Sequence, residues 1–140
     1  MRSASLLLLV AACSGTVTTP AQPDKARQQC EDLLGKWCSK ATDCLVEGKL
    51  IADTDAAYQR DACLSGAHQQ VDCSKAVAVK TSYDACMADI DAIACQSIVD
   101  AVKTKTSLTL PSTCNGVILV QSSLGAESRS PLVEAIAPTW

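Results

Sequence analysis

The chain has 140 residues, nine cysteines, no phenylalanine and a formal net charge of −3. A mildly acidic chain without a basic cluster is a poor fit to nucleic acid, which proteins bind through clustered lysine and arginine. Aromatic residues make up only 3% of the sequence, so a core of alanine and aliphatic side chains buries less apolar area than one with aromatic anchors. Covalent cross-links are therefore expected to supply part of the stability.

The first twelve residues follow the order that is typical of an export signal. Arg2 supplies the positive charge, the run from Leu6 to Ala12 is apolar, and Ala11 and Ala12 are the small residues that precede a cleavage site. The run is far shorter than the roughly 20 residues that span a bilayer as a helix. We interpret residues 1–12 as a signal peptide and expect no membrane-spanning helix.

The residues around the expected cleavage site carry a second signal. Val10-Ala11-Ala12-Cys13 resembles the bacterial lipobox, with Val10 where leucine is more usual. The resemblance implies that Cys13 becomes the lipidated first residue of the mature protein and anchors it to a membrane. Cysteine parity agrees, because lipidation of Cys13 leaves eight cysteines, which can pair completely. The alternative is an ordinary secreted protein in which Cys13 is removed or free.

Residues 13–23 contain two prolines, a glycine and no charged residue, which predicts a flexible tether. In Gram-negative bacteria, an aspartate directly after the lipidated cysteine often retains a lipoprotein in the inner membrane. Ser14 stands at that position here. The resemblance thus implies a location in the bacterial cell envelope, at the outer membrane if the source is Gram-negative.

Residues 24–120 are predicted to form one cysteine-rich helical domain. Apolar residues at steps of three and four predict a first helix over residues 25–46, with Asp24 as its N-cap and Gly48 as its C-cap. A second helix is expected after the acidic residues at 53 and 55, with an apolar face that runs from Ala56 to Val71.

The next segment holds the longest amphipathic stretch, from Tyr83 to Val102, after an approximate capping box formed by Thr81 and Asp84. Pro111 ends the helical part. The apolar run 117–120 is expected to cover the helices as a strand-like segment, and residues 121–140 are expected to form a weakly ordered tail. The predicted fold is an all-α, disulfide-stapled three-helix bundle.

The positions of the cysteines along the first two helices predict how some of them pair. If the first turn is centred near residue 51, one cysteine pair lies about 12 to 13 residues from it and another about 21 to 22 residues from it. A mismatch of one residue is small beside the Cα separations that a disulfide tolerates. The preferred pairs are therefore Cys30–Cys73 and Cys38–Cys63, while Cys44 pairs with Cys86 or Cys95 and Cys114 takes the remaining one.

The spacing of the cysteines from residue 24 to 114 looks like that of small cysteine-rich lipoproteins of myxobacteria and their relatives. The spacing comprises Cys30, Cys38 and Cys44 on one helix, Cys63 and Cys73 on the next, Cys86 and Cys95 on a third, then Leu110-Pro111-Ser112-Thr113-Cys114. The resemblance implies an exported helical domain, and it implies no particular activity.

Residues able to carry chemistry are few. His68 is the only histidine, so one chain cannot build a site with two imidazoles, and a Ser-His-Asp triad would have to form around this residue. The cysteines contain no Cys-x-x-Cys and lack the close pairs of a four-cysteine zinc site. We expect no metal and no cofactor, and we interpret His68 as part of an exposed polar helix face.

Two carboxylate clusters are the other candidates for a metal or acid–base site. They are Asp53 with Asp55, and Asp84 with Asp89 and Asp91. The first departs from an EF-hand loop at the third ligand and at the required glycine. Helix capping and solvated helix faces are the simpler interpretation of both clusters.

Two classes of function remain open from the sequence. The first is a non-enzymatic envelope lipoprotein that presents a rigid helical surface to a protein, a peptide or a cell-wall partner. The second is a small hydrolase-like enzyme that uses aspartate, serine or His68 in a cleft. Polar groups that converge in a concave pocket with shifted pKa values would favour the enzyme.

Overall fold

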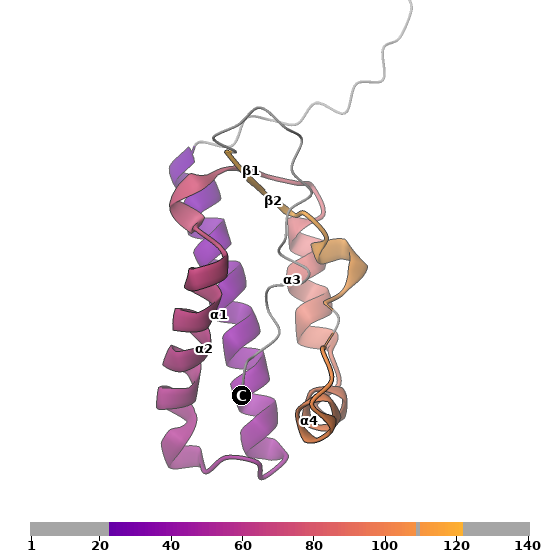
Figure 1. Cartoon of the computed structure of the whole chain (residues 1–140). Helices are drawn as coiled ribbons and strands as arrows, with labels where there is room; N and C mark the ends of the chain where they lie inside the picture. The colour runs from indigo at the N-terminus through magenta and orange to yellow at the C-terminus, as the bar shows by residue number, and fades with distance from the viewer. Residues whose placement is uncertain (1–22, 109, 122–140) are drawn as a thin grey trace, which may run out of the picture.

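The computed structural model describes residues 23–108 and 110–121. The chain is mostly helical, with four α-helices, two short strands and four disulfides. The elements are α1 (Pro23–Glu47), α2 (Ala56–Gln70), β1 (Ala76–Val79), α3 (Tyr83–Ala92), α4 (Cys95–Thr104) and β2 (Ile118–Val120), with 3-10 turns at Asp53–Asp55, Cys73–Lys75 and Ser112–Cys114. Figure 1 shows α1 between α2 on one side and α3 and α4 on the other, with the two strands at one end.

Helix α1 is the central element of the domain because α2, α3, α4 and β1 all pack against it and ten of its 25 residues are buried. Trp37, near the middle of this 25-residue helix, is only 1% exposed. Pro23 is the first helical residue, where the missing backbone N–H of proline costs no hydrogen bond. The side chains that α1 buries are those of Ala26, Cys30, Leu33, Leu34, Trp37, Cys38, Ala41, Thr42, Cys44 and Leu45.

The end of α1 differs from the expected glycine C-cap in an instructive way. The left-handed residue is Lys49, at φ 55°, and not Gly48. Lys49 N donates to Val46 O and Leu50 N donates to Leu45 O, both at 2.9 Å, which is the hydrogen-bond pattern of a Schellman motif. Gly48 is needed for a different reason, because a Cβ at this position would collide with the side chain of Val99 on α4.

The long third helix expected from the sequence is two helices. The chain leaves helical geometry at Ile93 and Ala94, whose ψ angles are 125° and 129°, and then turns sharply, so that α4 is seen end-on beside α3 (Figure 1). Neither residue type breaks a helix. The cause lies in packing, since Ile90 contributes to one buried cluster and Ile98 to a second, with Ile93 against both.

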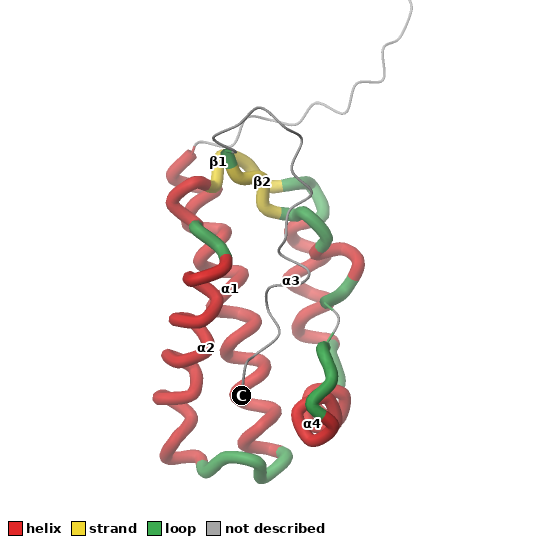
Figure 2. The backbone as a smooth tube through the Cα atoms, viewed as in Figure 1, coloured by secondary structure: helices red, strands yellow, loops and turns green. Residues whose placement is uncertain are grey.

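A two-stranded antiparallel sheet, visible at one end of the tube in Figure 2, corrects the all-α prediction. The sheet pairs Ala76 with Val120 and Val79 with Ile118, and an irregularity lies between Ala76 and Ala78. Strand β2 falls within the apolar run expected to cover the helices, whereas β1 was not expected. Ala76 and Ile118 are fully buried, so one face of the sheet closes the core.

Several predictions fall on parts of the chain outside the described residues. These are the signal peptide 1–12, the tether 13–23 except for Pro23, and the weakly ordered tail 121–140 except for Gln121. Pro23 is the first residue of α1 and not part of a tether. Among the described helices, none is both long enough and apolar enough to cross a membrane.

Candidate functional site

The eight cysteines of the described domain form four disulfides. Three of them join α1 to other elements, with Cα separations of 5.6, 5.7 and 4.7 Å, and the fourth joins α3 to the 3-10 turn after Pro111, at 4.8 Å. The pairs are Cys30–Cys73, Cys38–Cys63, Cys44–Cys95 and Cys86–Cys114. The first two are those expected from the helix positions, and the last two are one of the two arrangements that the sequence left open.

These sulfur atoms are occupied in cross-links and mostly buried. Six of the eight cysteines are at most 2% exposed, and only Cys63 and Cys95 are partly exposed. A sulfur in a disulfide is neither a thiolate nucleophile nor a thiolate metal ligand. The eight cysteines of the domain therefore have a structural role.

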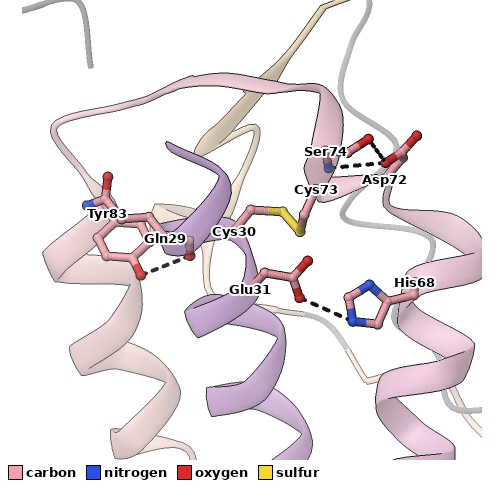
Figure 3. The surroundings of a disulfide bond; sticks show 8 residues. All are labelled: Gln29, Cys30, Glu31, His68, Asp72, Cys73, Ser74 and Tyr83. Carbon is pink, nitrogen blue, oxygen red and sulfur yellow. Dashed lines mark hydrogen bonds and ion pairs between the residues drawn. A yellow bond between two sulfur atoms is a disulfide. The ribbon is translucent and has the colours of Figure 1, made fainter. Parts of the chain in front are cut away.

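His68 lies near the end of α2, beside the Cys30–Cys73 disulfide (Figure 3). Its Nε2 atom is 3.2 Å from Oε2 of Glu31 on α1, and both side chains are about half exposed. In Figure 3 the hydroxyl of Ser74 points to Asp72 and not to His68. A catalytic triad needs a hydroxyl against one imidazole nitrogen and a carboxylate against the other. Glu31 and His68 instead form a contact between α1 and α2, and this contact is an ion pair when His68 is protonated.

Asp72 caps the 3-10 turn that carries Cys73. Its Oδ1 atom accepts hydrogen bonds from the backbone N–H and the hydroxyl of Ser74, and Lys75 Nζ lies 3.2 Å from its Oδ2. The hydroxyl of Ser74, and after it Lys75, lower the pKa of Asp72 below its usual value of 3.8. Since these partners are all local, the arrangement holds the chain in the turn that precedes β1.

Within residues 23–108 and 110–121, Tyr83 is the one side chain whose pKa the fold changes strongly. Its hydroxyl donates to the backbone oxygen of Gln29 at 3.0 Å (Figure 3). Burial, with smaller contributions from the charges of Asp32 and Asp84, raises the pKa of Tyr83 to about 12. A phenol kept neutral in this way is a hydrogen-bond donor between α3 and α1, and it is a poor general base.

The carboxylates of the first cluster form no ion pair with another described residue. Asp53 and Asp55 are exposed on the 3-10 turn before α2. Asp55 is the N-cap residue of α2, but its side chain makes no capping hydrogen bond, so the expected capping contact is wrong.

The carboxylates of α3 serve contacts between elements. Asp89 accepts a hydrogen bond of 2.8 Å from the hydroxyl of Thr113. Asp91 lies 2.6 Å from Lys36 Nζ, and its backbone oxygen accepts from Lys40. Asp84 lies in the first turn, and the N-cap there is Ser82, without a side-chain capping bond, in place of the expected capping box. No group of three or more potential metal ligands occurs in residues 23–108 and 110–121.

The exposed apolar side chains are the features that the sequence reasoning missed. Tyr58 is 73% exposed on α2, while Val77 and Leu119 are 38% and 37% exposed on the two strands. The alternation of alanine and valine over residues 76–79 is the available signal for β1, but four residues are short for a pattern of period two. Comparison of this chain with protein-family models, with curated proteins and with solved structures finds no match.

Proposed function

We propose that this protein is an envelope lipoprotein, anchored through Cys13, whose helical domain acts as a non-enzymatic binding or structural module. The observation that carries the proposal is the use of the cysteines. The four disulfides consume eight of the nine cysteines, so Cys13 has no cysteine left to pair with inside the chain. Cys13 also stands directly after a signal-like apolar run.

The disulfides also support export. Structural disulfides persist in oxidising compartments outside the cytosol. Four cross-links in a domain of this size therefore fit the envelope better than the cytoplasm. If the source is Gram-negative, Ser14 after the anchor favours the outer membrane, in keeping with the cysteine-rich lipoproteins that the spacing resembles.

The ionisable side chains support a module more than an enzyme. Ion pairs join α1 to its neighbours at three places, namely Glu31 with His68, Asp43 with Arg60 and Lys36 with Asp91. Each pair lies at the surface, where an ion pair contributes at most about 1 kcal/mol, and the four disulfides supply the main cross-links between the elements. A frame held in this way presents a surface of constant shape to an envelope protein, a peptide or a cell-wall partner.

Metabolic labelling with palmitate, followed by separation of soluble and membrane fractions, tests the anchor. The wild-type chain should incorporate label and stay with the membrane, while Cys13→Ser should do neither. Ser14→Asp is the matched variant, because it should keep the label but move the protein to the inner membrane of a Gram-negative host. Label in the Cys13→Ser chain, or its absence from the wild type, would refute the anchor.

The binding role is tested by chemical cross-linking in intact cells. A binding module should give the same cross-linked partner in independent preparations, and a surface variant such as Tyr58→Asp should change the yield of that product if the partner binds at α2. Failure to recover a reproducible partner would count against a binding role.

A further inference from the structure

The small sheet exposes an apolar pair on its outward face. Val77 and Leu119 are two of the three large apolar side chains that are exposed in the described part of the chain. Their neighbours Ala76 and Ile118 are fully buried. Leu119 pairs with Ala78, and Val77 lies in the irregularity between Ala76 and Ala78, where a bulge sets two residues opposite one. Val77 and Leu119 therefore meet on the side of the sheet that is open to solvent.

Lysines flank this pair at both ends of β1. Gln121 N donates to Lys75 O at 2.9 Å, and Lys80 N donates to Val117 O at 2.8 Å, so the backbone ladder fixes both lysines at the margins of the sheet. Lys80 Nζ has a backbone oxygen as its nearest partner, at 3.4 Å, and forms no ion pair with another described residue. Apolar side chains with amines at the margins suit a lipid headgroup region.

The sheet lies at the end of the domain where the expected anchor arrives. Figure 1 places the two strands beside the first turns of α1, and the turn between α1 and α2 at the opposite end. Cys13 precedes Pro23 by ten residues, which span at most about 36 Å when fully extended. A lipid on Cys13 therefore keeps this end of the domain within a short distance of the bilayer.

The charge distribution favours the same orientation. Residues 43–61, which include the turn at the far end, hold five acidic and two basic residues, a net charge of −3. Helix α4 also lies toward the far end (Figure 1). Asp100, Lys103 and Lys105, on and just after it, add a net charge of +1. The sheet end, counted over residues 23–28 and 72–84, holds four basic and three acidic residues, a net charge of +1. An anionic surface therefore repels the far end more than the sheet end.

From this placement we propose that the outward face of the β1–β2 sheet rests on the surface of a bilayer that contains anionic phospholipid. The inference rests on the proposed anchor and names the face that the anchored domain turns towards the membrane. Two partly exposed side chains and two lysines make a weak contact alone. It suffices here because the anchor raises the effective concentration of the surface at the sheet.

Site-directed photocrosslinking of the full lipidated chain tests this orientation. A benzophenone amino acid replaces Leu119 on the sheet in one variant and Tyr58 on α2 in the other. Each chain is placed in vesicles of phosphatidylcholine with and without phosphatidylglycerol. Position 119 should give several-fold more lipid adduct than position 58, with more adduct when phosphatidylglycerol is present. Lys75→Gln with Lys80→Gln should reduce the adduct at 119, while Lys103→Gln with Lys105→Gln should leave it unchanged.

Several results overturn the inference. They are equal lipid adducts at both positions, a cross-link from position 119 to a second copy of the chain, and a cross-link from 119 to residues 122–140 of the same chain. Intact mass of the same samples reports acylation, so the anchor and the orientation are judged separately. An acylated chain without an excess of adduct at 119 rejects the orientation alone. An unacylated chain rejects the anchor, and with it the orientation, which depends on the anchor.

Discussion

At the scale of single residues, Tyr83 shows how burial and nearby carboxylates raise the pKa of a side chain. The phenol has a folded-state pKa of about 12, against its ordinary value of 10.0. The folded state therefore holds its proton more tightly than the unfolded chain does. The contribution to stability is complete below pH 10 and is lost as the pH rises from 10 towards 12.

The chain has only two tyrosines, so Tyr58→Phe isolates Tyr83 for measurement. Rapid mixing to alkaline pH, followed by phenolate absorbance, should give a midpoint of about 12 for the folded variant and about 10 in denaturant. Tyr83→Phe should cost about 1 kcal/mol at neutral pH through the lost hydrogen bond to Gln29, and it should reduce the loss of stability between pH 10 and 12. A folded midpoint near 10 would contradict the described environment.

Asp72 gives the corresponding prediction at acidic pH. Ser74→Ala removes the largest cause of its lowered pKa, so the pKa of Asp72 should rise towards 3.8 in an NMR titration of the carboxyl carbon. Because the folded pKa is the lower one, the stabilising effect of Asp72 is present above pH 3.8 and is lost as the pH falls below it. Thr113→Ala is the control, since its hydroxyl binds Asp89 and its removal should leave Asp72 unchanged.

Two glycines of the same chain separate crowding from helix propensity. Gly48→Ala should lower the free energy of unfolding by about 1 to 3 kcal/mol, because the added methyl group collides with Val99. Gly35→Ala places its methyl group in open space on α1 and should raise stability by about 0.5 to 1 kcal/mol. Urea denaturation of the oxidised proteins measures both. In a Val99→Ala background, Gly48→Ala should lower the free energy of unfolding by less than it does in the wild-type chain. Equal decreases in the two backgrounds would show that the two side chains do not meet.

At the scale of elements, the spacing of apolar residues predicts helices whose ends are set by the local sequence. The spacing of apolar residues predicted α1 to within two residues at each end, and the distances from the first turn predicted two cysteine pairs. The break between α3 and α4 was not predictable in this way, since Ile93 and Ala94 have no local reason to leave a helix. Packing of Ile90 and Ile98 into different clusters decides it.

The Cys86–Cys114 disulfide links α3 to the segment that leads into β2, and its removal tests how the sheet is held. Cys86→Ala with Cys114→Ala should cost about 2 to 4 kcal/mol and should speed amide hydrogen exchange in β2 more than in α2. Cys38→Ala with Cys63→Ala is the matched control, because the Cys38–Cys63 disulfide spans 25 residues and the Cys86–Cys114 disulfide spans 28. Equal exchange changes in β2 for both variants would show that the sheet does not depend on the nearby cross-link.

At the scale of the whole molecule, the candidate site was less predictable than the fold. The sequence identified His68 and the aspartates as the groups to examine, but their partners come from other elements and are set only by the tertiary arrangement. Glu31 reaches His68 from another helix, and Lys36 reaches Asp91 in the same way. The exposed pair on the sheet was missed because β1 itself was missed.

The central claim also concerns the whole molecule. It is that a lipid on Cys13 anchors a domain whose other cysteines are all paired with one another. Intact-mass spectrometry of the mature chain, purified without reductant and treated with a thiol-alkylating reagent, tests both halves together. The account predicts an N-terminus at Cys13 that carries acyl chains, and no alkylated thiol. An unacylated N-terminus, or a mass increase from alkylation in the folded protein, would contradict it.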